Sequence, residues 1–178
     1  TLVGITGTNG KTSIAGFVRQ LWEASGIKGA SVGTLGIETS GGLVSGSLTT
    51  PDAETLHRSL NQLKLGGIDH IVMEASSHGL DQRRLDGIAI AAAGFTNLGR
   101  DHMDYHPTVA DYLAAKLRLF GTILPADGTA VIDMDGAYAD QVLEAARERG
   151  VDILRVAPAA DATRIADLPA DGLRQRLT

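Results

Sequence analysis

Residues 6–12, with the sequence Thr-Gly-Thr-Asn-Gly-Lys-Thr, have the composition of a phosphate-binding loop. Their glycines let backbone N–H groups turn inward around phosphate oxygens, Lys11 supplies a full positive charge, and the Thr12 hydroxyl is suited to bind Mg²⁺. An apolar run precedes the loop and a segment with helical spacing follows it, so a helix N-terminus is expected to add partial positive charge. The loop departs from the pattern G-x-x-x-x-G-K-S/T, because Ile5 stands at its first glycine. The alternative is a Gly-rich turn with a surface lysine.

Glu74 is a second candidate, because it directly follows the apolar run at 70–73. Open α/β sheets place ligand chemistry at the carboxyl ends of their strands. A carboxylate at that position would hold Mg²⁺ close to bound phosphates. The alternative is a solvated glutamate at a strand end.

The charged stretch at 81–85 is expected to be a solvated face, with Arg83 as a surface residue.

The segment 97–107 carries two histidines and two aspartates within a few residues, directly after another apolar run. The spacing of His102, Asp104 and His106 is compatible with a zinc cluster. It is equally compatible with a polar loop that contains one functional histidine. Loop histidines are more often structural or exposed than metal ligands, so no chemical role is expected for His106.

Lys116 lies within a segment of helical spacing that starts at Thr108 and runs to about Phe120. The spacing places this lysine on the apolar side of the helix. A snorkelling lysine is the common explanation for such a position. The alternative is a partly desolvated lysine, whose lowered pKa makes it a neutral, nucleophilic amine.

These candidates need a scaffold that brings them together, and the alternation of strands and helices provides one. We expect strands at 2–5, 30–37, 70–73, 88–95, 129–132 and 152–156, and helices at 13–25, 53–65, 108–120 and 138–149. This order predicts an α/β fold with a mostly parallel sheet flanked by helices on both faces. We expect a turn at 40–47 and an edge element outside the main sheet at 157–178. Thr49 and Thr50 are either turn residues or ligand-facing hydroxyls, and the local pattern slightly favours the turn.

The composition bounds the class of protein. With 178 residues and 43% hydrophobic residues, the chain is long enough for one domain with a substantial core. Its net charge of −5 argues against general affinity for nucleic acid or for an anionic membrane surface. The absence of cysteine excludes disulfides and thiolate metal sites, and is consistent with a cytoplasmic protein. The sequence contains no membrane-spanning run and no signal peptide.

Four ordered motifs resemble the central ATP-binding domain of the Mur ligases. They are the loop at 6–12, Glu-Ala-Ser-Ser-His-Gly-Leu at 74–80, Asn-Leu-Gly-Arg-Asp-His-Met-Asp-Tyr-His at 97–106 and Tyr-Leu-Ala-Ala-Lys at 112–116. Together with Thr-Thr-Pro at 49–51, they are most similar to the branch that adds the third amino acid of the peptidoglycan peptide. The resemblance covers the chain to about residue 150. It implies a P-loop nucleotide-binding fold. Because the chain does not begin with Met, we expect residues 1–178 to be a single-domain fragment, without the family's N-terminal UDP-binding and C-terminal ligase domains.

The resemblance also implies roles for individual residues. The ATP phosphates would be held by Gly7, Thr8, Asn9, Gly10, Lys11 and Thr12, with Asn97 and Asp101 as supporting residues near the nucleotide. One Mg²⁺ would be bound by Thr12 and Glu74. A second would be bound by His102 and by a carbamate that CO₂ forms on Lys116, an assignment that displaces the zinc hypothesis. The catalytic residues implied are Lys11, His102 and Lys116. Contacts to the UDP-MurNAc-dipeptide would come from Thr49, Thr50, Ser76, Gln82 and Arg84.

The reaction implied is ATP-dependent formation of an amide bond through an acyl phosphate. It would join meso-diaminopimelate or L-lysine to UDP-MurNAc-L-Ala-D-Glu, and the sequence does not distinguish these two amino acids. One alternative is a relative with another substrate, such as folylpolyglutamate synthase or another Mur ligase. A second alternative is an isolated nucleotide-binding module without turnover. Residues 132–135 depart from the family pattern, which leaves a contact to the adenosine in doubt.

Overall fold

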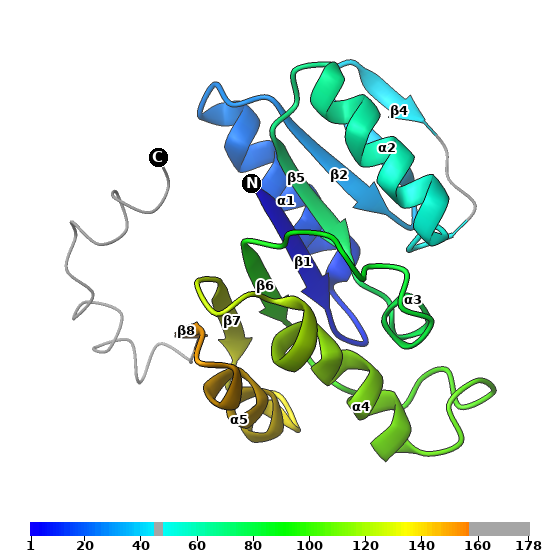
Figure 1. Ribbon diagram of the computed structural model, residues 1–178, viewed down its shortest axis with the longest axis vertical. Coiled ribbons are helices and arrows are strands. Elements are labelled where there is room, and N and C mark those ends of the chain that lie inside the picture. The colour runs from blue at the N-terminus through cyan, green and yellow to red at the C-terminus, as the bar shows by residue number, and fades with distance from the viewer. Residues whose placement is uncertain (45–47, 157–178) are drawn as a thin grey trace.

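A computed structural model describes residues 1–44 and 48–156, which form one eight-stranded sheet with helices on both faces (Figure 1). The strand order is β4-β3-β2-β5-β1-β6-β7-β8. The strands are β1 (Leu2–Thr6), β2 (Gly29–Gly33), β3 (Gly36–Thr39), β4 (Gly42–Val44), β5 (His70–Glu74), β6 (Ala92–Phe95), β7 (Thr129–Asp133) and β8 (Asp152–Val156). The helices are α1 (Lys11–Ala24), α2 (Ala53–Leu65), α3 (Ser77–Asp81), α4 (Val109–Arg118) and α5 (Ala139–Arg149), with one π-helical turn, η1 (Leu119–Ile123), after α4.

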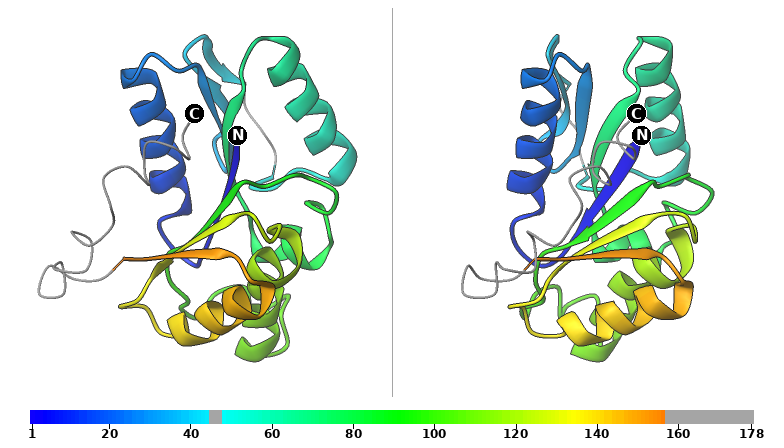
Figure 2. Two further views of the ribbon diagram at one scale, coloured as in Figure 1. Left: turned by 60° about the vertical axis from the view of Figure 1, so that its left-hand side comes forward. Right: turned by 90° about the vertical axis from the view of Figure 1, so that its left-hand side faces the viewer.

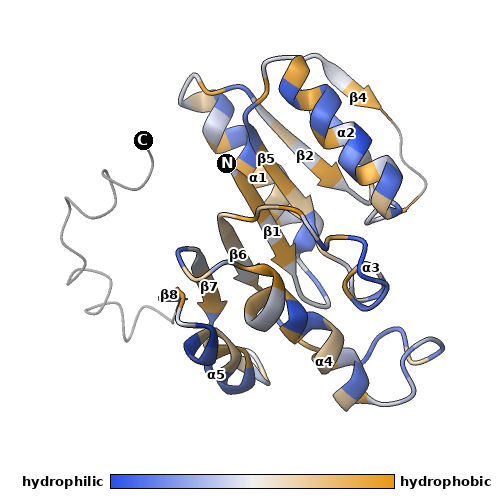
Figure 3. Cartoon of the chain, viewed as in Figure 1, coloured by the Kyte–Doolittle hydropathy of each residue, from blue (hydrophilic) through white to orange (hydrophobic). Residues whose placement is uncertain are grey.

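The predicted α/β architecture is confirmed, since every neighbouring pair from β2 to β8 is parallel. Helix α1 covers one face of the sheet, where Ala15 packs with Ile5 and Val72. Helices α2, α4 and α5 cover the other face and bury a larger apolar cluster (Figure 2). Apolar residues follow the strands and hydrophilic residues the outer sides of the helices, as Figure 3 shows. Within the described residues, no helix is long and apolar enough to cross a bilayer.

The order of the strands fixes the position of the site. β5 and β6 are the two neighbours of β1, with Ile5 in register with Glu74 on one side and Gly94 on the other. All three strands run in the same direction, so the loops that follow them meet at one edge of the sheet. The chain leaves β1 toward β2 on one side and reaches β6 on the other, and such a switch in direction is where open α/β sheets bind ligands.

Several local predictions were wrong. The run 30–37 is not one strand, because the chain reverses between β2 and β3, where Gly36 adopts a φ of 111° that glycine tolerates. The predicted turn at 40–47 contains β4, and 45–47 lie outside the described residues. The strand predicted at 88–95 begins only at Ala92, and the helix predicted at 13–25 begins at Lys11. The prediction for 157–178 also falls outside the described residues.

Candidate active site

The loop between β1 and α1 has a backbone that requires glycine at two positions. Gly7 has a φ of 150°, and a Cβ atom there would lie 1.9 Å from the Thr96 Oγ1. Gly10 is in the left-handed region, with a φ of 85°, and forms the N-cap of α1. No side chain caps α1 and its first turn has no acidic residue, so its N-terminus remains available to an anion. The Lys11 Nζ donates to the carbonyls of Gly7, at 2.9 Å, and Thr8, at 2.8 Å.

The segment after β6 holds this loop in place. The Thr8 N–H donates to the Asn97 carbonyl at 2.8 Å, and the Asn9 N–H donates to the Asn97 Oδ1 at 3.0 Å. The Thr96 hydroxyl donates to the Asn9 carbonyl at 2.7 Å. The side chain of Asn97, which was predicted to be a supporting residue near the nucleotide, is hydrogen-bonded to the backbone of the loop.

Glu74 is 2% exposed, so the hypothesis of a solvated glutamate was wrong. Its Oε1 accepts hydrogen bonds from the Thr12 hydroxyl and from the Thr34 N–H, each at 2.9 Å. A Cβ atom on Gly33 would lie 2.0 Å from the same oxygen, so only glycine leaves room for this carboxylate at the end of β2. A carboxylate and a hydroxyl beside an anion-binding helix N-terminus are hard oxygen donors that suit Mg²⁺.

Lys116 is 1% exposed and does not reach solvent, so the snorkelling hypothesis was wrong. Its Nζ donates to the Gly7 carbonyl at 2.9 Å, the same carbonyl that accepts from Lys11, and lies 4.4 Å from the centroid of the Tyr112 ring. Burial, together with the nearby charge of Lys11, lowers the pKa of Lys116 to about 7, while Asp101 opposes the shift. Burial also lowers the pKa of Lys11, against the opposing effects of Glu74 and Asp101. The pKa values of both amines that donate to the Gly7 carbonyl are thus lowered by burial.

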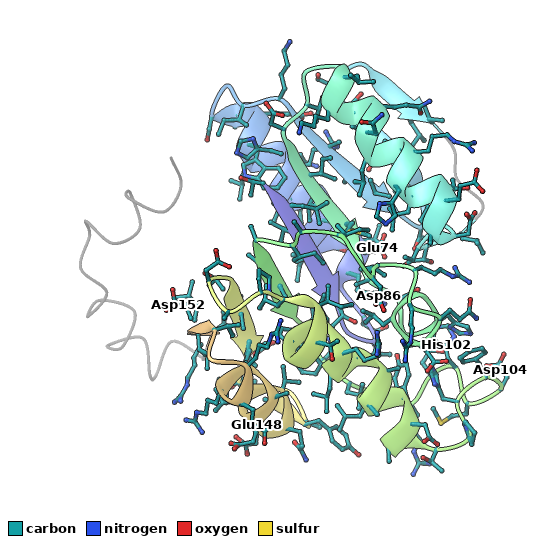
Figure 4. The ribbon with its side chains drawn as sticks, viewed as in Figure 1. Glu74, Asp86, His102, Asp104, Glu148 and Asp152 are labelled. Carbon is teal, nitrogen blue, oxygen red and sulfur yellow. The ribbon has the colours of Figure 1, made fainter. Side chains whose placement is uncertain are left out.

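His102 is held by the residue before it. It adopts a φ of 55°, its N–H donates to the Asp101 Oδ1 at 2.8 Å, and its Nε2 lies 3.6 Å from the Asp101 Oδ2. Figure 4 shows Glu74 at the carboxyl end of β5 and His102 in the loop before α4, whereas Glu148 and Asp152 lie on the far side of the molecule. No group of three or more His, Cys, Asp or Glu side chains within 1–44 and 48–156 is arranged to hold a metal ion, so the zinc hypothesis has no support.

His106 is buried, with 3% exposure, and its ring centroid lies 5.2 Å from that of Tyr112. Burial lowers the pKa of His106. It therefore packs in the interior next to α4 and is not among the residues that line the cleft; that it has no chemical role stays a prediction.

Hydrogen bonds connect four of the five residues predicted to contact a substrate, and the fifth, Thr49, contacts Thr34. The buried Thr50 hydroxyl donates to the Glu74 carbonyl at 2.8 Å and lies 2.9 Å from the Ser76 Oγ. The Arg84 Nη1 donates to the Thr50 carbonyl at 2.6 Å, and its Nε donates to the Gln82 Oε1 at 3.0 Å. Thr49 lines the cleft, and its hydroxyl is 3.1 Å from that of Thr34. Arg83 is exposed, as predicted.

Most of the predicted residues surround one cleft of about 310 Å³. Its lining consists of Thr8, Asn9, Gly10, Lys11, Thr12, Thr34, Thr49, Glu74, Ser76, Ser77, His102 and Lys116. The predicted residues that do not line it are Gly7, Thr50, Gln82, Arg84 and Asn97. Sequence reasoning missed Thr34 and Ser77. Thr34 follows a glycine directly after an apolar run, a signal of a strand end that the predicted long strand concealed. Ser77 stands inside a motif that the sequence did single out.

Comparison with known proteins identifies the family. The family model of the Mur ligase middle domain matches residues 5–175. The UDP-N-acetylmuramoyl-L-alanyl-D-glutamate–2,6-diaminopimelate ligase of Bradyrhizobium diazoefficiens is 50% identical over 100% of this chain and 38% of its own length. The enzyme of the same name from Agrobacterium fabrum is 55% identical over 88% of this chain and 32% of its own. The chain thus spans about a third of the length of these relatives.

Solved structures agree with this assignment. A structure of UDP-N-acetylmuramoyl-L-alanyl-D-glutamate–2,6-diaminopimelate ligase superposes with a TM-score of 0.81 at 36% identity, over 90% of this chain and 32% of that one. Mycobacterium tuberculosis folylpolyglutamate synthase complexed with ADP superposes with a TM-score of 0.69 at 21% identity, over 86% of this chain and 42% of that one, and shares the fold. The resemblance read from the four motifs is therefore confirmed: the chain belongs to the Mur ligase family and corresponds to its middle domain.

Proposed function

We propose that this chain is the ATP-binding domain of an enzyme that joins meso-diaminopimelate to UDP-MurNAc-L-Ala-D-Glu during peptidoglycan synthesis. The observation that carries the proposal is the arrangement around Gly7, whose carbonyl accepts from both Lys11 and Lys116 while Glu74 pairs with Thr12 next to it. This arrangement combines a phosphate loop, a metal-binding carboxylate and a buried amine in one cleft. The names of the relatives favour diaminopimelate over lysine.

The phosphates of ATP would bind at the N-terminus of α1, with their charge facing the N–H groups of the loop from Gly7 to Thr12. Lys11, which donates to two loop carbonyls, would turn its amine toward the β- and γ-phosphates. Asn97 would act indirectly, by fixing the backbone of Asn9. In-line attack on the γ-phosphate depends mainly on positioning and charge, which this rigid loop supplies.

The oxygen and nitrogen donors of the cleft are suited to bind two Mg²⁺ ions. Thr12 and Glu74 would hold the first ion. The hydrogen bond of 2.9 Å between the Thr12 hydroxyl and the Glu74 Oε1, next to α1, supports this site. His102 and a carboxylated Lys116 would hold the second. When bound, the two ions would neutralise the charge that develops on the transferred phosphoryl group.

Lys116 is suited to form a carbamate. Its amine is buried and has a pKa of about 7, so near neutral pH a large fraction is neutral. The neutral nitrogen would attack CO₂, forming an N–C bond and releasing the nitrogen's proton to water. The resulting carbamate carries a negative charge, which the amine does not. Its oxygens would provide the metal ligands that a lysine lacks.

The acceptor substrate would lie against Thr49 and Ser76, which line the cleft, with Thr50, Gln82 and Arg84 behind them. The D-Glu side-chain carboxylate would attack the γ-phosphorus in line, with ADP as the leaving group and an acyl phosphate as the product. The amine of diaminopimelate would then attack the acyl carbon, and the tetrahedral intermediate would collapse to an amide and phosphate. By orienting the D-Glu carboxylate toward the γ-phosphate, the residues around Thr49 and Ser76 would accelerate the reaction through proximity.

The rest of the enzyme would lie in flanking domains that bind uridine and select the incoming amino acid, because this chain spans 38% or less of these relatives. Like its nucleotide substrates, the enzyme would work in the cytoplasm. Folylpolyglutamate synthase shares the fold at 21% identity, so this alternative is not favoured over ligases that are 50% identical. For the isolated domain we expect nucleotide binding without turnover.

The test is phosphate release by the full-length protein with ATP, Mg²⁺ and UDP-MurNAc-L-Ala-D-Glu. Three reactions are compared, containing meso-diaminopimelate, L-lysine or no amino acid. We expect release that depends on meso-diaminopimelate. Dependence on lysine would correct the third residue of the peptide, and no stimulation by either amino acid would refute the proposal. The isolated domain, assayed in parallel, measures how much of the activity needs the flanking domains.

A further inference from the structure

Ser77 carries a buried hydroxyl that has no hydrogen-bond partner among residues 1–44 and 48–156. It is the first residue of α3 and is 1% exposed. Within the described part of the chain, its Oγ has no donor or acceptor at hydrogen-bond distance. Buried hydroxyls normally have a partner, because an unpaired one destabilises the folded state. Its partner is therefore expected to come from a bound molecule.

The helix does not need this hydroxyl, because the preceding serine caps it. The Ser76 Oγ accepts from the Gly79 N–H at 3.1 Å and lies 2.9 Å from the Thr50 Oγ1. At the first helical position after such a cap, alanine is as good a residue as serine. Folding therefore accounts for Ser76 and gives no reason for a hydroxyl at 77.

The surroundings of Ser77 indicate what would pair with it. Ser77 lines the same cleft as Lys116, and α3 packs against α4, which carries this lysine. The buried carboxylate of the cleft, Glu74, already accepts from Thr12 and Thr34. An acidic group that entered the cleft beside Lys116 would bring an acceptor oxygen, and a hydrogen bond from a hydroxyl to a carboxylate is one of the stronger kinds in proteins.

We propose that the Ser77 hydroxyl donates a hydrogen bond to a carboxylate oxygen that enters the cleft beside Lys116. The inference rests on the proposed function, which supplies two such carboxylates: the carbamate on Lys116 and the D-Glu carboxylate of the substrate. In either case Ser77 is a binding residue whose partner arrives with CO₂ or with the substrate. This explains a hydroxyl that weakens the unliganded fold.

The experiment compares Ser77→Ala with Ser31→Ala in the full-length protein. Ser31 is also a buried serine, with 6% exposure, but its hydroxyl donates to the Glu38 Oε2 at 3.3 Å. Three quantities are measured: the Tm without ligands, kcat and KM for UDP-MurNAc-L-Ala-D-Glu at low and high bicarbonate, and the carbamate signal in ¹³C NMR with labelled bicarbonate. We expect Ser77→Ala to keep or raise the Tm and to lose roughly ten- to hundredfold in kcat/KM. Ser31→Ala should lower the Tm and leave the kinetics within about twofold.

The measurements also identify the source of the carboxylate. If the partner is the carbamate, the NMR signal weakens in Ser77→Ala and high bicarbonate partly restores kcat. If it is the substrate, the NMR signal is unchanged and KM rises. Ser77→Cys, which keeps a weak donor of similar size, should fall between alanine and serine. Wild-type kinetics and NMR signal in Ser77→Ala would overturn the inference, as would a fall in Tm that accounts for the lost activity. Wild-type protein in the same assay reports on the proposed function separately, and the NMR and Tm measurements decide on Ser77 even if that function fails.

Discussion

Around the carboxyl ends of β5, β1 and β6, the protein buries charged and polar groups. Glu74 and Lys116 are 2% and 1% exposed, and the Ser77 hydroxyl is unpaired within the part of the chain that the structure describes. Around α5 the arrangement is the reverse. There the buried side chains are apolar, as for Val142 and Leu143, and the charged ones lie outside. Both regions rest on the same eight-stranded sheet: the cleft lies at the carboxyl ends of its central strands, and α5 packs against β7 and β8.

The two regions differ in what their residues contribute. Burial of apolar surface stabilises the fold, whereas burial of a charge or of an unpaired hydroxyl opposes folding unless a partner compensates. The α5 region therefore carries stability. The cleft holds groups whose burial opposes folding, and their presence there points to ligands. Substitutions should separate the two regions: cleft variants should lose activity and keep stability, and α5 variants should do the opposite.

The largest effect is expected for Lys116→Met in the full-length enzyme. Methionine fills the space but cannot form a carbamate, so phosphate release should fall by roughly a thousandfold or more, and excess bicarbonate should not restore it. Stability should rise. The unfolded lysine has a pKa near 10.5 and the folded one about 7, so wild-type stability increases with pH between these values, where the unfolded chain binds the extra proton.

The Tm advantage of Lys116→Met should therefore be greatest below pH 7 and shrink as the pH rises toward 10. The matched control is Lys64→Met, at an exposed lysine of α2, which should change neither activity nor the pH dependence of the Tm. Normal activity in Lys116→Met would contradict the carbamate role, and a lower Tm at pH 6 would contradict the account of burial.

Glu74→Gln should have the next largest effect. The amide keeps an oxygen for Thr12 and Thr34, so the fold should be retained, but the charge that attracts Mg²⁺ is lost. We expect activity to fall by roughly a hundredfold and the Mg²⁺ concentration for half-maximal rate to rise. Titrating Mg²⁺ in the phosphate-release assay measures both. Glu38→Gln, on β3 of the same sheet, is the control, and an equal rise in the Mg²⁺ requirement of that variant would show that Glu74 has no special role.

On the other side of the comparison, Leu143→Ala should destabilise the protein and leave its catalysis intact. Leu143 is 5% exposed in the core beneath α5, and removing three buried carbons creates a cavity. We expect a loss of about 2–4 kcal/mol in the free energy of unfolding, measured with denaturant. At a temperature where the variant remains folded, kcat should match that of the wild type. A large loss of kcat without loss of stability would show that the two regions are coupled.

The sequence predicted which segments form the cleft, but not how deeply its side chains are buried. The loop at 6–12, Glu74 and the segment at 97–102 were predicted to converge, because each follows a strand and parallel strands end at one edge. Helical spacing also placed Lys116 on the apolar side of its helix. The depth of its burial was not accessible, because the carbonyl that binds its amine belongs to Gly7, which is 109 positions away in the chain.

The hairpin of β2 and β3 shows a different limit of sequence-based prediction. The run 30–37 contains no signal stronger than its glycines, so local pattern could not distinguish one long strand from two short ones. The turn between β2 and β3 brings Thr34 to Glu74, and a Cβ on Gly33 would collide with that carboxylate. The reason for this glycine is thus a partner on another strand. Local propensity predicted the elements, while contacts between distant segments determined the details of the site.

The smallest effect is expected for Arg147→Ala on the outer side of α5. The Arg147 Nη1 lies 3.8 Å from the Glu144 Oε2, and both side chains are more than half exposed. Solvent screens such a pair, so its loss should change the free energy of unfolding by at most about 0.5 kcal/mol. Arg118→Ala is the informative contrast, because that side chain is 23% exposed and donates to the Leu80 carbonyl and to Asp86 at 2.9 Å each, so a larger loss is expected. Equal losses in denaturant melts would mean that exposure does not determine what these charges contribute. A graded series, from Arg147 through Arg118 to Leu143, would show that stability in this half of the molecule follows burial, which is the rule that the cleft breaks.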